Sequence, residues 1–168
     1  MTTFNVRRLK LLLGEEHREQ IEVELPVFTF GGERYVPVPE AVAAEFVVNR
    51  AVTGMLFTLA FTARLHGPCH RCLGDAVLEV PVFAREYQAS SDDDEELSTP
   101  YLVDDELQLS DWARDAVSLA LPDRILCRPD CAGLCPECGE NLNTNPHQHA
   151  SQATDSRWAA LESLRDQL

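Results

Sequence analysis

An α+β fold is predicted for this chain, with a largely antiparallel β-sheet body, two C-terminal helices and a cysteine-rich segment. Three observations predict it. Apolar and polar residues alternate over several stretches of the N-terminal half, as in strands with one face in water. Two later stretches space their apolar residues three or four positions apart, as in helices. Finally, the cysteines of the chain lie in closely spaced groups.

The first strands are separated by glycine turns. Residues 20–25 alternate apolar and acidic or amide side chains, which predicts a strand with one wet face. Gly31-Gly32 predicts the turn of a hairpin that joins residues 27–30 to residues 34–38. Pro37 confines the second arm to a sheet edge or a strand end, because proline cannot donate to a ladder.

The clearest predicted strand covers residues 55–65, where large apolar residues occupy every second position. Gly67-Pro68 ends this strand immediately before Cys69, and residues 76–87 resume a strand pattern. The first cysteine pair is therefore predicted to sit at the tip of a hairpin. A metal bound there would clamp the two strand ends together.

An acidic stretch and two helices follow. Residues 89–106 are polar and acidic and contain Pro100, so they are predicted to form a mobile loop. Ser110 is a suitable N-cap for a helix over residues 111–121. A last helix is expected from about Ser156, where apolar residues recur at helical spacing.

A chain of 168 residues is long enough for one ordinary hydrophobic core. We expect a β-rich body over 1–122 and a cysteine-rich segment with the last helix over 123–168, integrated in one domain. The apolar run 11–13 is far too short for the core of a signal peptide, and no segment reaches membrane-spanning length. We therefore expect a soluble cytoplasmic protein without a membrane partner.

The cysteines indicate a metal site, because a reducing compartment disfavours disulfides. Residues 69–72 and 135–138 are CxxC elements, which place two thiolates within reach of one ion and are typical of zinc knuckles. The two elements would face each other in one tetrahedral site, or the last four cysteines would close a site locally, at a lower loop-closure cost. Both arrangements remain open. The candidate ligands are Cys69, Cys72, Cys127, Cys131, Cys135 and Cys138.

The sequence argues against catalysis. A redox CxxC begins a helix, whereas Asn and Pro residues follow Cys138. A hydrolytic zinc site keeps an open position and commonly uses His or carboxylate ligands, and the chain has no HExxH motif. His147 and His149 lie in a polar stretch and are expected to be solvent-exposed rather than ligands. The sequence therefore predicts a non-enzymatic protein with structural zinc.

The net charge of −14 argues against a protein that coats nucleic acid with its whole surface. Much of this charge lies in residues 92–106, which either bind a basic protein or form a solvated loop. Four arginines near the cysteines are candidate RNA contacts, because a guanidinium pairs with phosphate and stacks on bases. The alternative is that they only maintain solubility. These residues are Arg64, Arg71, Arg124 and Arg128.

Three stretches together resemble a known family. They are Cys-His-Arg-Cys-Leu at 69–73, the run from Leu126 to Asn143 with its Gly-Leu-Cys-Pro-Glu-Cys-Gly core, and Asp-Ser-Arg-Trp at 155–158. They are similar to the YceD family of bacterial proteins, which has chloroplast relatives. One departure is Ser156, where the family often has proline.

The resemblance implies a ribosome-biogenesis factor that supports the accumulation of large-subunit, 23S, ribosomal RNA. It implies ribosomal RNA or a pre-ribosomal particle as the partner. The alternative is a zinc-stapled interaction module that binds a basic ribosomal or assembly protein without contacting RNA.

Overall fold

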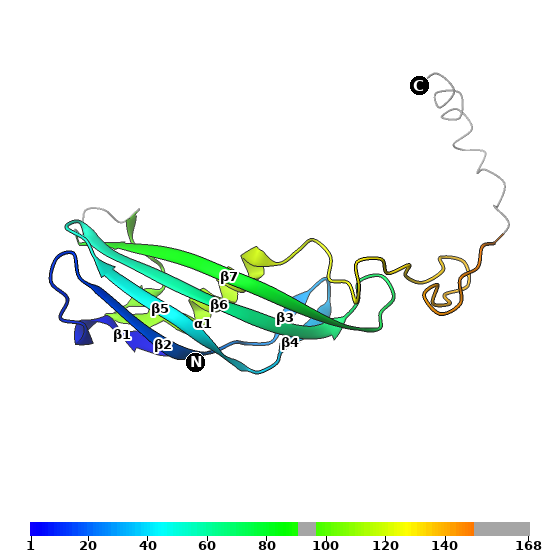
Figure 1. Ribbon diagram of the computed structural model, residues 1–168, viewed down its shortest axis with the longest axis horizontal. Coiled ribbons are helices and arrows are strands. Elements are labelled where there is room, and N and C mark those ends of the chain that lie inside the picture. Colours follow the sequence, from blue (N-terminus) through cyan, green and yellow to red (C-terminus); the bar gives the residue numbers. More distant parts are fainter. Residues whose placement is uncertain (91–96, 150–168) are drawn as a thin grey trace, which may run out of the picture. The chain divides into compact units, whose positions relative to one another are not determined.

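The computed structural model in Figure 1 describes residues 1–90 and 97–149. The chain divides into two compact units, the first comprising Met1–Cys131 and the second beginning at Ala132. The first unit contains all the named strands and helices.

A six-stranded antiparallel sheet forms the body of the first unit, in the order β2-β5-β6-β4-β3, with β7 also paired to β6. Strand β6 is central because β7 pairs along its whole length, while β5 and β4 pair with successive parts of its other edge. Its alternating sequence places one set of side chains in the core and the other outside. The strands are β2 (Glu16–Glu24), β3 (Phe28–Phe30), β4 (Glu33–Pro37), β5 (Ala41–Arg50), β6 (Gly54–Pro68) and β7 (Asp75–Ala89).

A second, three-stranded sheet has the order β1-β9-β8. Its strands are β1 (Thr3–Asn5), β8 (Leu102–Val103) and β9 (Glu106–Gln108), and the short 3-10 helix η1 (Val6–Arg8) follows β1. The predicted mobile loop over 89–106 is therefore wrong in its last part. Leu107 of β9 is fully buried, and pairing with β1 orders this stretch despite its acidic neighbours. Residues 91–96 of the predicted loop lie outside the described residues.

Helix α1 (Leu109–Ala120) follows β9 directly and packs against β7, β2 and β1. Trp112 is the largest fully buried side chain of the described residues, so it anchors the helix in the core. The predicted helix is confirmed, but it begins at Leu109 instead of Asp111. Ser110 lies inside the first turn, and its Oγ accepts a hydrogen bond from the Thr2 amide at 2.8 Å instead of capping the helix.

The predicted β-rich α+β fold is confirmed, including the β3–β4 and β6–β7 hairpins. Among the described residues α1 is the single α-helix, and the second predicted helix, from about Ser156, lies outside them. In the same part of the chain, no helix has the length and apolar character needed to cross a bilayer.

Candidate metal centre

The tip of the β6–β7 hairpin is a tight loop that carries Cys69 and Cys72. The Cys69 amide donates to the Gly74 carbonyl at 2.7 Å, and the Leu73 amide donates to the Cys69 carbonyl at 3.0 Å. Leu73 adopts a left-handed conformation with φ 58°, which closes the turn after the second cysteine. These two bonds turn the chain back on itself, so both thiols are presented together.

Tyr35 of β4 supports the base of this loop. Its hydroxyl donates to the Pro68 carbonyl at 3.0 Å, and its side chain is buried. Its ring lies directly over Gly67, where a Cβ atom would be 2.2 Å from Tyr35 Cδ1. Burial is the main cause that raises the pKa of Tyr35, with smaller contributions from Glu33 and Cys69. The hydroxyl therefore remains a hydrogen-bond donor at neutral pH.

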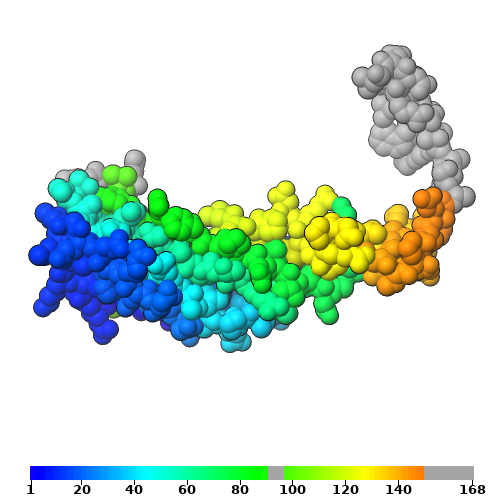
Figure 2. Space-filling view, viewed as in Figure 1, coloured from blue at the N-terminus to red at the C-terminus, as the bar shows by residue number. Residues whose placement is uncertain are grey.

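The segment 121–131 brings the next two cysteines back to the hairpin tip. In Figure 2 this yellow segment lies beside the green end of β6 and β7. The His70 amide donates to the carbonyl of buried Ile125 at 2.8 Å. The Arg71 guanidinium donates from Nη1 to the Cys131 carbonyl at 2.8 Å. Cys131 is therefore tied to the first cysteine loop through its backbone.

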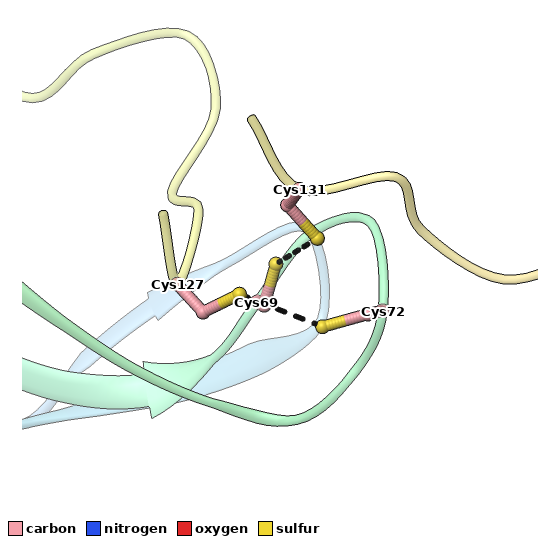
Figure 3. Close-up of side chains that lie close together, drawn as sticks. All are labelled: Cys69, Cys72, Cys127 and Cys131. Atoms are coloured by element: carbon pink, nitrogen blue, oxygen red, sulfur yellow. Dashed lines mark hydrogen bonds between the residues drawn. The ribbon is translucent and has the colours of Figure 1, made fainter. Parts of the chain in front are cut away.

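Four sulfur atoms converge at this place (Figure 3). Cys69 Sγ lies 3.8 Å from Cys131 Sγ, and Cys72 Sγ lies 3.7 Å from Cys127 Sγ. A disulfide bond measures about 2.05 Å, so these are separate thiols. Around a tetrahedral ion with metal–sulfur distances of about 2.3 Å, the sulfurs lie about 3.8 Å apart. The spacing therefore fits a tetrahedral four-thiolate site.

The electrostatics of the four thiols are uneven. Burial disfavours the Cys69 thiolate, but amide groups of Cys72, Cys127 and Arg71 bond to the sulfur and bring the pKa of Cys69 to about 6. Burial and the neighbouring cysteines raise the pKa of Cys127 to about 12. Without a cation, one thiolate therefore keeps its neighbours protonated, since like charges disfavour each other. A divalent cation would let all four ionise.

Neither of the two cysteine arrangements left open by the sequence is the one that the structure contains. The first CxxC element meets the CxxxC element of the segment after α1, whereas the second CxxC element lies in the second unit. Chain reversal after α1, which sequence spacing does not reveal, produces this pairing. The group in the first unit is Cys69, Cys72, Cys127 and Cys131.

The second CxxC element has partners that sequence reasoning missed. Cys135, Cys138, His147 and His149 offer four ligand atoms within 4.8 Å of one another. His149 is exposed, as expected, and His147 is half-buried, but both rings are turned towards the cysteines. The sequence feature that could have identified these two histidines as candidate ligands is the His-x-His spacing shortly after a CxxC element. Both groups of side chains are thus suited to hold a metal ion.

The four candidate RNA-binding arginines are exposed. Arg71 uses its guanidinium to bind the Cys131 carbonyl, and Arg128 Nε lies 3.4 Å from Asp130 Oδ1. Arg64 lies on β6, opposite Glu79 of β7 in the strand register. Arg124 precedes the buried Ile125 in the segment that returns to the hairpin tip.

Comparisons with known proteins agree with these motifs. The family described as "Large ribosomal RNA subunit accumulation protein YceD" matches residues 57–165. An uncharacterized protein of Mycobacterium tuberculosis is 40% identical over 120 residues, which cover 68% of this chain and 57% of that protein. A maize protein named "Large ribosomal RNA subunit accumulation protein YCED homolog 1, chloroplastic" is 43% identical over 42 residues, or 25% of this chain and 14% of that protein.

The matched part of this chain covers 57% of the length of the Mycobacterium tuberculosis relative. It covers 49% of the length of a relative from Mycobacterium leprae. No solved structure matches the chain. The family match includes most of β6, all of β7 and α1, and both cysteine groups. Because it covers well over half of the chain, the chain belongs to the YceD family.

Proposed function

We propose that this chain is a cytoplasmic, non-catalytic ribosome-biogenesis factor that supports the accumulation of large-subunit, 23S, ribosomal RNA. The match of residues 57–165 to a family described by that role carries the proposal. The chloroplast relatives of maize and Arabidopsis thaliana bear the same description in their names.

The first metal centre takes structural zinc in this proposal. Zinc favours thiolates and tetrahedral geometry, and the sulfur separations of 3.7 and 3.8 Å suit that geometry. Four protein ligands leave no open position for water or substrate, which is the arrangement of structural rather than catalytic zinc. The ligands are Cys69, Cys72, Cys127 and Cys131.

Zinc would connect the hairpin tip to the segment that follows α1. The backbone bond from the His70 amide to the Ile125 carbonyl already ties that segment to the hairpin loop. Holding the segment would also hold Arg124 in a defined position relative to Arg64 on β6. Two fixed guanidinium groups can bind phosphates of a folded RNA with less loss of side-chain freedom than two mobile ones.

A second candidate function is an interaction module for a basic ribosomal or assembly protein, without direct RNA contact. The net charge of −14 favours this candidate. Within residues 92–106, however, Asp105 pairs with Arg7, and Glu106 accepts a hydrogen bond from Asn5 at 2.6 Å. The carboxylates of Asp105 and Glu106 are therefore already bound to side chains of η1 and β1. A basic partner would bind the remaining acids of the stretch.

RNA binding by the purified full chain tests the proposal. We expect binding to 23S ribosomal RNA fragments to weaken with added salt, because arginine contacts release counterions. The double variant Arg64→Glu with Arg124→Glu should weaken binding at least tenfold. The matched control is Arg8→Glu, an exposed arginine on η1 outside the segments that form the metal centre.

Two other outcomes are informative. If the charge-reversed variant binds RNA as tightly as the parent, the proposal that these arginines contact RNA directly is wrong. If pulldowns recover basic ribosomal proteins after nuclease treatment and retain no RNA, the interaction module becomes the preferred function. A deletion strain supplies the cellular measurement, in which the ratio of 23S to 16S ribosomal RNA should fall and be restored by the parent chain.

A further inference from the structure

The described part of the second unit has almost no apolar core. Between residues 132 and 149, only Gly133 and Cys135 are buried. The regular backbone pairing of this stretch is a single isolated bridge between Leu134 and Asn141. Apolar burial among these residues therefore contributes little to their order, and bound metals commonly stabilise segments of this kind.

The second CxxC loop repeats the backbone turn of the first. The Cys135 amide donates to the Glu140 carbonyl at 2.8 Å, and the Gly139 amide donates to the Cys135 carbonyl at 2.9 Å. The loop of residues 69–74 makes both bonds between equivalent positions. Gly139 has φ 76° where Leu73 has φ 58°, so both loops close with a left-handed residue after the second cysteine.

The two histidines are oriented by their Nδ1 atoms. His147 Nδ1 lies 2.8 Å from the Asn145 carbonyl, and since a carbonyl only accepts, Nδ1 donates and its Nε2 lone pair is left free. That Nε2 faces Cys138 Sγ at 3.2 Å. His149 Nδ1 lies 3.5 Å from a Glu137 carboxylate oxygen. Anchoring of one ring nitrogen by a carbonyl or carboxylate is the usual outer shell of a metal-binding histidine.

The free nitrogens of the two rings converge, with His147 Nε2 and His149 Nε2 3.1 Å apart. Ligands of a tetrahedral zinc ion bound through nitrogen lie about 3.3 Å apart. We propose that Cys135, Cys138, His147 and His149 bind a second divalent ion of the zinc class, independently of the first centre. The site offers two sulfur and two nitrogen ligands, and the ion orders the chain between residues 132 and 149.

Metal content of the full chain, purified without a polyhistidine tag or added metal, tests this proposal. We expect about two ions per chain for the parent, since each tetrahedral centre holds one. The variants Cys138→Ser and His149→Asn should each retain about one ion, and Cys72→Ser should also lose one. The matched control is His70→Asn, an exposed histidine inside the first CxxC loop, which should keep both ions.

Cobalt substitution identifies which centre is lost. A four-thiolate site has stronger sulfur-to-cobalt charge transfer than a site with two thiolates, so the two centres give different spectra. His149→Asn should leave the four-thiolate spectrum, whereas Cys72→Ser should leave the mixed one. One ion per chain in the parent, with no change in His149→Asn, overturns the second centre. None of these measurements depends on the proposed role in ribosome biogenesis.

Discussion

Arg71 donates from Nη1 to the carbonyl oxygen of Cys131 at 2.8 Å, which joins the two loops that supply the cysteines of the first candidate metal centre. Arg71 lies between Cys69 and Cys72 in the sequence, while Cys131 comes from the segment after α1. The bond therefore fixes one ligand-bearing loop relative to the other. This arginine has an architectural role in addition to any contact with RNA.

Replacing Arg71 should weaken metal retention. Arg71→Met and Arg71→Lys should both lose zinc to a competing chelator at about tenfold lower chelator concentration, because changes around metal ligands cost about 10–100-fold in affinity. Lysine keeps the charge but lacks the planar fork that reaches the carbonyl. Arg64→Met on β6 is the matched control and should retain zinc like the parent. Equal retention in all variants would contradict the architectural role.

Metal removal should loosen the segment 121–131 selectively. Amide hydrogen exchange measured with and without a chelator should increase in this segment and in the loop of residues 69–74. The paired centre of β6 and β7 should remain protected, because its ladder does not involve the metal. Exchange that increases uniformly over the sheet would show that zinc stabilises the whole unit instead.

Tyr35 should contribute to the stability of the cysteine loop, although it lies far from the cysteines in the sequence. Tyr35→Phe removes the hydroxyl that binds the Pro68 carbonyl and should lower the free energy of unfolding by about 0.5–1.5 kcal/mol. Gly67→Ala should be more damaging, because the new Cβ would be 2.2 Å from the Tyr35 ring. Denaturant titration of the purified protein measures both.

The double variant Gly67→Ala with Tyr35→Ala provides the control. Removing the ring should relieve most of the clash and leave only the Arg34 carbonyl oxygen, at 2.9 Å, in close contact. The loss of stability in the double variant should therefore be smaller than the sum of the losses in Gly67→Ala and Tyr35→Ala. Simple additivity would contradict the proposed contact.

Trp112 should be the anchor of α1. Trp112→Ala should lower the free energy of unfolding by about 3–5 kcal/mol, because it leaves a large cavity beneath the helix. Leu119→Ala on the same helix is the control, since Leu119 is 89% exposed and its loss should change stability by less than about 0.5 kcal/mol. Urea denaturation monitored by circular dichroism checks both values.

The carboxylate of Asp115 should stabilise the folded protein at neutral pH, and this stabilisation should be lost in acid. Its carboxylate accepts hydrogen bonds from Arg114 Nε at 2.8 Å and from the Tyr101 hydroxyl at 3.0 Å. Arg114, followed by Tyr101, holds the pKa of Asp115 below its ordinary value. A carboxyl with a lowered folded pKa stabilises the protein above its unfolded pKa of about 3.9, and this stability is lost as the pH falls through the folded pKa.

Asp115→Asn should therefore be less stable than the parent at pH 6 and should lose less stability than the parent between pH 5 and 3. Protonation of the metal ligands affects both proteins alike, so the difference between them isolates the carboxylate. Unfolding measured at each pH gives this difference. Parallel curves would show that the ionisation of Asp115 does not contribute.

Local patterns in the sequence determined several strands, the two cysteine loops and helix α1. The alternation over residues 55–65 predicts β6 because a half-buried strand repeats every two residues. The CxxC spacing predicts the two cysteine loops because the turn that presents both thiols closes within a few residues. The helical spacing around Trp112 predicts α1 within two residues of its start.

Tertiary structure alone decided which cysteines meet. Cys127 and Cys131 reach the hairpin tip only because α1 packs on the sheet and the following segment turns back, and such long-range placement leaves no local pattern. The acidic stretch near Leu107 forms strands for the same reason, since pairing with β1 and burial outweigh its composition. Local periodicity specifies elements, whereas contacts between distant segments specify which of their side chains form a site.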